Sequence, residues 1–398
     1  MSSDPIQRSA GWSTSSAPTI LEYFGWADSW HGNVARLAVD AGVSCGHAAP
    51  MIPSRMRAAV YKGKQTIAVE DYPTPAVGPT DVLLEVSHCG VCGSDIHFVL
   101  EGWSAPERVH GHEYSGTVVA IGDDVTRWSV GDAVVGGPGM RCGTCEFCSA
   151  GRPNLCSGRE AVGGGDGQGA FAEYMRVPEA ALLRLPTGLT LRHAALTEPL
   201  SVALHGITLA AVKPGDRVLI TGGGPIGALS AAALIHRGVT DVVVSEPSPA
   251  RRALCARLGA TVIEPESLTT PTMPDQIVDR PFHAALECSG HAVAMEQCLG
   301  QLARTGRLVL VGAGITPPRF DPNRIILNEL VITGSFCYDA DGFEAALALL
   351  VAPDFPTDAL IEPDDVGLEG LRDAIGRLAA GEIPAKVVVA PSRGRSTT

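Results

Sequence analysis

The sequence predicts an α/β protein in which an all-β region precedes a doubly wound parallel sheet. From residue 56 the chain shows short runs of β-branched residues bounded by glycine, which is typical of strands. From residue 215 such strands alternate with helical patterns, and this alternation indicates a parallel sheet. With 398 residues, the chain is long enough for two domains.

Composition and charge exclude several classes of function. The chain is 45% hydrophobic and 18% charged, which suits an ordinary globular core. Its net charge of −13 argues against binding nucleic acid, which requires a basic surface. No run of eighteen or more apolar residues predicts a membrane span, and no basic start followed by an apolar run predicts a secretory signal. We therefore expect a cytoplasmic protein.

Residues 1–55 differ from the rest of the chain. Serine, proline, glycine and alanine are frequent there, hydrophobic periodicity is weak, and Trp12, Trp26 and Trp30 are three of the five tryptophans. We expect a disordered or loosely packed extension, or a segment that results from an upstream start codon.

The first strands predicted after this segment form an all-β region, and its candidate functional residues lie on the loops between strands. They are Arg57–Tyr61, Asp81–Val86, Thr117–Ile121 and Gly131–Val135. The second of these strands leads into a loop that contains Cys92. His112 and Glu113 follow twenty and twenty-one positions later.

A thiolate, an imidazole and a carboxylate suit a catalytic zinc ion, which keeps three protein ligands and one open position. Glu113 is suited to one of two roles: it binds the zinc ion directly, or it lies behind His112 without binding the ion. Ser94 and His97 follow Cys92 closely and are candidates to pass a proton to water. Taken singly, Cys92 is better explained as a small buried hydrophobic residue and His112 as an ordinary histidine, and the interpretation depends on their combination.

Four more cysteines give the most specific signal in the chain. Cys142, Cys145, Cys148 and Cys156 are separated by three, three and eight positions. Four thiolates within fifteen residues fit a closed tetrahedral zinc site, and metal binding there would supply folding free energy. The eleven cysteines are an odd number, six of them between Cys92 and Cys156, which favours metal ligation in a reducing compartment over disulfides.

The segment Thr197–His205 begins a helical pattern with Glu198 and Pro199 in its first turn. A carboxylate at this position also suits the helix dipole, so the pattern alone leaves its role open.

The second region opens with a dinucleotide-binding pattern. The strand Gly215–Thr221 leads into a turn followed by a helix to His236, and the next strand, Asp241–Glu246, ends in an acid. The turn permits close approach of a pyrophosphate, which its glycines and the following helix would bind. The candidate cofactor residues are Gly222, Gly224, Pro225, Ile226, Gly227, Glu246 and Arg251. Glu246 would accept hydrogen bonds from the ribose and so favours NAD over NADP, whereas Arg251 and Arg252, which follow closely, could accommodate a 2′-phosphate.

The remaining pattern continues the alternation and then returns to strand. Strands are expected at 261–263, 283–288, 307–311 and 330–333, helices at 291–303, 342–350 and 368–380, and a last strand at 386–390. We expect this tail to rejoin the first domain, because the β-barrel begun near Met56 otherwise lacks its closing elements.

The segment Gly111–Gly116, followed by Gly122 and Val125, resembles the zinc signature of the zinc-dependent medium-chain alcohol dehydrogenases. The resemblance implies a GroES-like β-barrel catalytic domain at 56–201 and 344–398, and a Rossmann domain at 202–343. It also implies a catalytic zinc on Cys92 and His112 and a structural zinc on the four clustered cysteines, giving two zinc ions per chain.

The third catalytic ligand separates branches of that family. Thr197–His205 is similar to the sorbitol, 2,3-butanediol and threonine dehydrogenase branch, in which an acid replaces a cysteine. This implies Glu198 as the third ligand, with Glu113 as an exchangeable or outer carboxylate. Polyol dehydrogenases often lack the four structural cysteines, so the substrate stays open.

The activity implied is hydride transfer between a primary or secondary alcohol, including diols and polyols, and NAD, giving an aldehyde or a ketone. Zinc would lower the pKa of the alcohol, and Ser94 would relay the proton outward through His97. The resemblance also implies a homodimer or homotetramer. The alternatives are a zinc-free quinone or enoyl reductase of the same fold, and a zinc-ribbon binding protein without catalysis.

Overall fold

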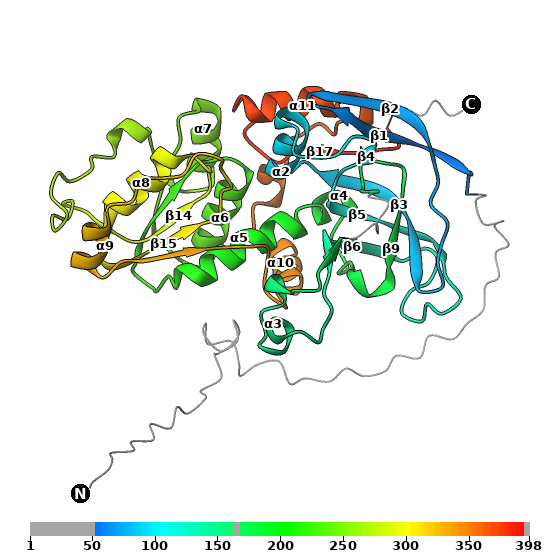
Figure 1. Ribbon diagram of the computed structural model, residues 1–398, viewed down its shortest axis with the longest axis horizontal. Coiled ribbons are helices and arrows are strands. Elements are labelled where there is room, and N and C mark those ends of the chain that lie inside the picture. The colour runs from blue at the N-terminus through cyan, green and yellow to red at the C-terminus, as the bar shows by residue number, and fades with distance from the viewer. Residues whose placement is uncertain (1–51, 162–167, 394–398) are drawn as a thin grey trace, which may run out of the picture. The chain divides into compact units, whose positions relative to one another are not determined.

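The computed structural model describes residues 52–161 and 168–393 (Figure 1). The expected extension at residues 1–55 lies almost entirely outside these residues, so that expectation stays a prediction. The first strand, β1, runs from Arg55 to Gly63, and its Met56 side chain is only 1% exposed. The regular core therefore begins at the predicted position.

The first region consists of antiparallel sheets. A three-stranded sheet has the order β2 (Thr66–Pro73), β1 and β4 (Arg108–Val109). A six-stranded sheet has the order β10 (Leu182–Arg184), β6 (Ala133–Gly136), β5 (Glu113–Ile121), β3 (Asp81–Gly90) and β17 (Val388–Val389), with β9 (Tyr174–Pro178) also paired to β3. Large side chains such as Tyr61, Tyr114 and Phe171 fill the core that these sheets share. The packing of these side chains fixes the strands from which the loops with Cys92 and His112 extend.

The end of the chain returns to this first region, as the sequence predicts. In β17, Val388 pairs with Gly90 and Val389 pairs with Cys89 of β3. The helix α11 (Leu371–Ala379) contacts the helical turn α2 (Gly93–Ile96), and Figure 1 shows the red C-terminal segment beside the blue strands β1 and β2. Residues from the two ends of the described chain thus complete one core.

The second region is a six-stranded sheet of parallel strands. Its order is β13 (Thr261–Ile263), β12 (Asp241–Ser245), β11 (Arg217–Thr221), β14 (Phe282–Glu287), β15 (Leu302–Leu310) and β16 (Val331–Gly334). The chain order reverses direction at β11, which lies between β12 and β14. Ligands of such sheets bind at the carboxyl ends of the strands beside this point.

Helices cover both faces of the parallel sheet. Leu219 and Ile220 are neighbours in β11, yet they belong to two different core clusters, which shows that both faces are buried. The helices are α5 (Thr197–Ala210), α6 (Pro225–His236), α7 (Pro249–Arg257), α8 (Ala292–Gln301), α9 (Pro322–Asn328) and α10 (Gly342–Leu350). Leu200 of α5 and Ala346 of α10 pack in the same cluster as Ile220. These two helices therefore join the catalytic region to the sheet.

Short elements complete the fold. They are the π-helical turn η1 (His97–Glu101), the strands β7 (Gly139–Met140) and β8 (Glu160–Ala161), the helical turns α3 (Glu146–Ser149) and α4 (Leu191–Ala194), and the 3₁₀ turns η2 (Pro153–Leu155), η3 (Glu179–Ala181), η4 (Pro265–Ser267), η5 (Thr357–Leu360) and η6 (Leu368–Gly370). Among the described residues, no helix has both the length and the apolar character that crossing a bilayer requires.

Candidate functional site

Cys92, His112 and Glu113 lie together at the end of the six-stranded sheet. One ligand atom from each lies within 4.8 Å of the others. Cys92 precedes the turn α2, and its backbone N–H donates to Oδ2 of Asp95 at 2.9 Å. Glu113 is the first residue of β5, so the carboxylate and the neighbouring imidazole are positioned by the start of that strand. A thiolate, an imidazole and a carboxylate at this spacing form a set of ligands that zinc accepts.

Two glycines permit the two loops to approach. A Cβ added to Gly90 would overlap Oε2 of Glu113. Gly111 has φ +99°, and a Cβ there would lie 2.8 Å from the backbone nitrogen of Phe171 and 2.9 Å from Sγ of Cys89. Any larger residue would force the loops apart, so both positions require glycine.

Glu113 forms an ion pair with Lys386, a residue from the C-terminal segment. The Nζ of Lys386 lies 2.8 Å from Oε1 of Glu113, and it also donates to the carbonyl of Val91 at 3.0 Å. Burial by itself lowers the pKa of Lys386, but the negative charges of Glu113 and Cys92 outweigh burial and raise the pKa overall. The second oxygen of Glu113, Oε2, is buried without a hydrogen-bond partner. That oxygen is available to a cation.

Glu198 lies outside the group of three but acts on it. Its side chain is 5% exposed in the first turn of α5, and no hydrogen bond or ion pair reaches its carboxylate within the described part of the chain. Burial raises the pKa of Glu198 to about 7, and the charge of His112 acts in the opposite direction. A buried carboxylate without a partner is costly unless a cation compensates it. Glu113, rather than Glu198, is the carboxylate grouped with Cys92 and His112 within 4.8 Å, whereas Glu198 and His112 influence each other through their charges.

Ser94 and His97 differ in their surroundings. The Oγ of Ser94 is buried without a partner, which leaves a hydroxyl next to Cys92 available to a ligand. The Nδ1 of His97 lies 2.8 Å from Oε2 of Glu101, and its ring stacks on Trp103 with the ring centroids 4.5 Å apart. No hydrogen bond joins the two residues, so a relay between them needs an intervening water.

Three further residues contribute to the site that the sequence did not indicate. Asp95 is fully buried, and burial raises its pKa to about 6. His110 stacks on Phe98 and has a buried, unpartnered Nε2. Lys386 belongs to the segment 386–390, for which the sequence predicts a strand and nothing more. The spacing Cys92-Gly-Ser-Asp95 could have identified Asp95 as a capping residue, whereas nothing local identifies the other two.

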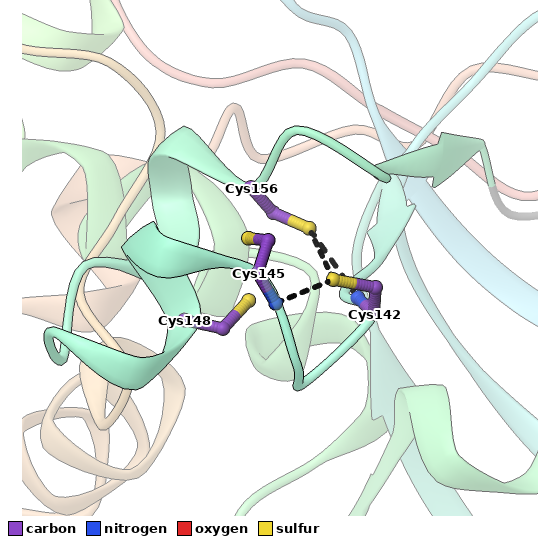
Figure 2. A group of neighbouring side chains, drawn as sticks. All are labelled: Cys142, Cys145, Cys148 and Cys156. Atoms are coloured by element: carbon purple, nitrogen blue, oxygen red, sulfur yellow. Dashed lines mark hydrogen bonds between the residues drawn. The ribbon is translucent and has the colours of Figure 1, made fainter.

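The four clustered cysteines form the second group of potential metal ligands. All four Sγ atoms lie within 4.8 Å of one another. Figure 2 shows the side chains of Cys142, Cys145, Cys148 and Cys156 pointing toward one another from a loop and the turn α3. The N–H of Cys145 donates to Sγ of Cys142 at 3.3 Å, and the N–H of Cys142 donates to Sγ of Cys156 at 3.3 Å. Such N–H···S bonds stabilise thiolates, so the group fits a closed tetrahedral zinc site.

This cysteine lobe docks onto the segment 336–340, which follows β16. Asn154 donates to the carbonyl of Phe336 at 3.1 Å. Arg141 donates to the carbonyls of Asp339 and Ala340 at 3.2 and 3.3 Å. The lobe thus joins the two regions of the chain.

The glycine-rich turn lies at the carboxyl end of β11, where the sequence placed the cofactor. A Cβ on Gly227 would overlap the carbonyl oxygen of Gly222, and Gly222 itself has φ +89°. A Cβ on Gly224 would meet only the guanidinium of Arg251, at 3.8 Å. The turn therefore requires Gly222 and Gly227, whereas Gly224 leaves an open face for a pyrophosphate. Pro225 and Ile226 begin α6.

Glu246 and Arg251 both lie against this turn, next to Gly223 and Gly224 respectively. The carboxylate of Glu246 is 3% exposed and accepts hydrogen bonds from the N–H groups of Gly223 and Ser248, at 2.6 and 2.7 Å. The guanidinium of Arg251 donates to the carbonyl of Leu378 at 2.7 Å, which ties α7 to the end of α11. Glu246 therefore helps to shape the turn, and Arg251 also contributes to the contact between the two regions.

Comparisons with known proteins agree with this architecture. Residues 78–187 match the model of the alcohol dehydrogenase GroES-like domain, and residues 225–352 match that of the zinc-binding dehydrogenase. These matches favour a dehydrogenase over the zinc-free reductase and the zinc-ribbon binding protein.

Individual relatives cover most of the chain. The present chain is 32% identical to the sorbitol dehydrogenase of Bacillus subtilis, over 86% of this chain and 99% of that protein. It is 34% identical to 2-dehydro-3-deoxy-L-galactonate 5-dehydrogenase of Pseudoalteromonas atlantica, over 75% of this chain and 88% of that protein. A crystal structure of a zinc-binding dehydrogenase from Sinorhizobium meliloti bound to NADP superposes with a TM-score of 0.75 at 30% identity, covering 85% of this chain and 100% of that one. The chain belongs to the family of zinc-dependent medium-chain alcohol dehydrogenases.

Proposed function

We propose that this enzyme oxidises a secondary or primary alcohol within a diol or polyol to the ketone or aldehyde, using zinc and NAD. The observation that carries the proposal is the convergence of Cys92, His112 and Glu113 within 4.8 Å, and the charge of the buried Glu198 carboxylate also acts on His112. This arrangement suits a cation that keeps one position open for a substrate oxygen.

In this proposal, Cys92, His112 and one of the two carboxylates hold the zinc ion. A zinc ion bound there supplies a Lewis acid, and a bound nicotinamide supplies the hydride acceptor. The buried hydroxyl of Ser94 lacks a partner and is placed to accept the proton that the alcohol loses. His97, which is 20% exposed and paired with Glu101, is the next group toward solvent and would pass the proton on through water.

The substrate class is proposed from the relatives. The two named above act, according to their names, on sorbitol and on 2-dehydro-3-deoxy-L-galactonate, both of which carry several hydroxyl groups. We therefore propose a secondary alcohol in a polyhydroxylated chain as the reacting group.

NAD is proposed over NADP because of Glu246. Its carboxylate ends β12 beside the glycine-rich turn, where a 2′-phosphate would meet negative charge. Arg251 is held by the carbonyl of Leu378, which reduces its freedom to turn toward a phosphate. The relative from Sinorhizobium meliloti binds NADP, so both cofactors must be measured.

The second zinc ion, the assembly and the compartment complete the proposal. The four thiols fit a structural zinc ion, and we propose two zinc ions per chain. Ile326 and Leu327 are 68% and 57% exposed on α9, next in sequence to the edge strand β16, and these features support a homodimer or homotetramer. Unpaired cysteines support a cytoplasmic enzyme.

A substrate screen tests the proposal. Zinc-loaded protein is assayed with primary alcohols, secondary alcohols, vicinal diols, polyols and threonine, each with NAD⁺ and NADP⁺. We expect reduction of the cofactor with at least one polyhydroxylated secondary alcohol, and zinc content near two per chain. If zinc is bound but no alcohol in the panel is oxidised, the proposed activity is wrong.

A further inference from the structure

Glu287 is a buried carboxylate that the proposed chemistry does not use. It is the last residue of β14, and its side chain is 0% exposed. Its Oε1 accepts hydrogen bonds from the N–H groups of Ser289 and Gly290, at 2.7 and 3.0 Å, and from the hydroxyl of Ser289. A buried carboxylate costs free energy unless hydrogen bonds compensate it. The loop 288–291 supplies these bonds, so its backbone is folded around the Glu287 side chain.

The same residue also holds the loop that follows the next strand, β15. The backbone carbonyl of Glu287 accepts hydrogen bonds from the N–H groups of Val311 and Gly312, both at 2.8 Å. A Cβ on Gly312 would lie 3.0 Å from Oε2 of Glu287, so the two segments pack closely at this point. The side chain and the backbone of one residue thus connect the loops 288–291 and 311–314.

The glycine-rich turn packs against the loop that Glu287 holds. A Cβ on Gly222 would lie 2.9 Å from both N and Cβ of Ser289. The N–H of Cys288 donates to the carbonyl of Thr221 at 2.8 Å, one position before the turn. A shift of Ser289 would therefore either press on Gly222 or leave it without support.

These three loops meet at the edge of the sheet where a dinucleotide is expected. Glu287 pairs with Thr221 in the parallel register of β11 and β14, and β11 is the strand at which the strand order reverses. Ligands of doubly wound sheets bind in the crevice at this edge. Because the side chain of Glu287 is not exposed, it does not touch a ligand there and acts only through the loops that it holds.

We propose that Glu287 is a positioning residue for the nicotinamide dinucleotide. Its carboxylate holds the loop 288–291 against the glycine-rich turn, and the affinity for NAD depends on that support. The inference rests on the cofactor assignment of the proposed function, because it concerns the same site. A loop that already has its bound shape avoids the ordering cost of binding, so loosening the loop weakens binding even where the fold survives.

Equilibrium binding of NAD⁺ and NADH to the zinc-loaded protein, without any alcohol, tests the proposal. Calorimetry measures Kd for NAD⁺, and quenching of tryptophan fluorescence measures Kd for NADH. In Glu287→Gln, the amide keeps one acceptor oxygen and turns an NH₂ group toward the N–H groups of the loop, so both Kd values should rise by about tenfold. At saturating NAD⁺, kcat should change by less than about threefold while KM for NAD⁺ rises in parallel with Kd.

Glu173→Gln is the matched control. Glu173 is 1% exposed, and its carboxylate accepts the N–H of Arg57 on β1 at 3.0 Å, in the first region. The same chemical change at an equally buried carboxylate should leave both Kd values unchanged. The melting temperature of each variant establishes that it is folded. Ser289→Ala is a milder change of the loop: it removes the hydroxyl that donates to Glu287 and should raise both Kd values by about threefold.

The outcomes are distinct. An unchanged Kd in Glu287→Gln, or an equal rise in Glu173→Gln, overturns the positioning role and leaves the proposed function standing. If Glu287→Gln does not fold, Ser289→Ala decides in its place, and an unchanged Kd there overturns the role. If Kd responds as expected while no alcohol of the earlier screen is oxidised, the proposed activity is wrong and the positioning role stands. If the unmodified protein binds neither NAD⁺ nor NADH, the positioning role and the NAD assignment are both overturned.

Discussion

The Nζ of Lys386 lies 2.8 Å from Oε1 of Glu113, although the two residues are 273 positions apart in the chain. Their side chains are 2% and 1% exposed, so this ion pair is shielded from water on all sides. The pair neutralises one of the carboxylates that surround the proposed zinc ion. It also fixes the oxygen Oε1 in place and leaves Oε2 unpartnered.

Replacing Lys386 by methionine should therefore destabilise the protein strongly. The substitution leaves Glu113 buried and unpaired, and breaking a buried pair in this way costs about 3–5 kcal/mol. We expect the free energy of unfolding, measured with urea, to fall by that order. Lys62→Met is the matched control, because Lys62 pairs with Glu70 and Glu107 at the surface, where water and salt screen an ion pair and its contribution to stability is small. Equal losses in the two variants would contradict the special role of the buried pair.

The two groups of potential ligands predict different responses to cysteine loss. Cys92→Ser should abolish turnover and reduce the zinc content from two ions to one, while the protein stays folded. Cys145→Ser should lower stability or solubility instead, because its site contributes to folding. Elemental analysis of purified protein, together with initial rates, distinguishes the two. Normal turnover of Cys92→Ser would show that the catalytic assignment is wrong.

Glu198→Gln separates a metal-facing carboxylate from a helix-start residue. If Glu198 faces zinc, the neutral amide should reduce kcat by about 10- to 100-fold. If Glu198 only complements the dipole of α5, activity should stay near normal, with a stability change of about 0.3–1 kcal/mol. Initial rates and thermal melts, measured on the same preparation, decide between these two roles of Glu198. Glu344→Gln, in the first turn of α10, is a control for general effects of removing a helix-start acid.

Cofactor preference should depend on the charge of Glu246. Glu246→Gln keeps an oxygen that can accept the N–H of Gly223 or of Ser248, so the turn is preserved better than with alanine. We expect the ratio of kcat/KM for NAD⁺ to that for NADP⁺ to favour NAD⁺ in the unmodified enzyme. The ratio should fall by about tenfold in the variant, because repulsion of the 2′-phosphate is lost. An unchanged ratio argues that Glu246 only shapes the turn.

His88 should make stability depend on pH. Burial lowers its pKa below the ordinary value of 6.5, with Asp365 acting in the opposite direction. Below about pH 6.5 the unfolded state therefore binds more protons than the folded state, and the free energy of unfolding falls as the pH falls. In His88→Gln, the loss of stability between about pH 7 and about pH 5 should be smaller. His283→Gln, at an exposed position, should keep the original slope.

The sequence indicated the order and type of the main elements correctly because their signals are local. β13 occupies the predicted residues, and β11, β12 and β14 differ from prediction by two residues or fewer at each end. The four cysteines were identifiable because all of them fall within one short segment. The family resemblance, carried by the segment Gly111–Gly116, is confirmed by the matches to the dehydrogenase models.

Contacts between segments that are distant in sequence could not be predicted, because no local signal indicates them. Nothing near residue 386 indicates that its lysine meets Glu113, because β17 reaches β3 only through tertiary packing. Arg159 resembles any loop arginine until Cys337 and Phe336 are placed beside it. The helical turns at 93–101 also went unpredicted, since they are too short to show hydrophobic periodicity.

The pairing of β17 with β3 has a consequence for how the protein is made. On a ribosome, the cysteine lobe emerges as fifteen consecutive residues and contains all four thiols needed to capture a zinc ion. The other ligand group contains Glu113, whose counter-ion, Lys386, is synthesised 273 residues later. The thiols of the cysteine lobe are therefore all present on the nascent chain long before the ion pair beside the other ligand group can form. A chain that stopped before Lys386 would lack β17 and the counter-ion of Glu113 but would keep all four clustered thiols.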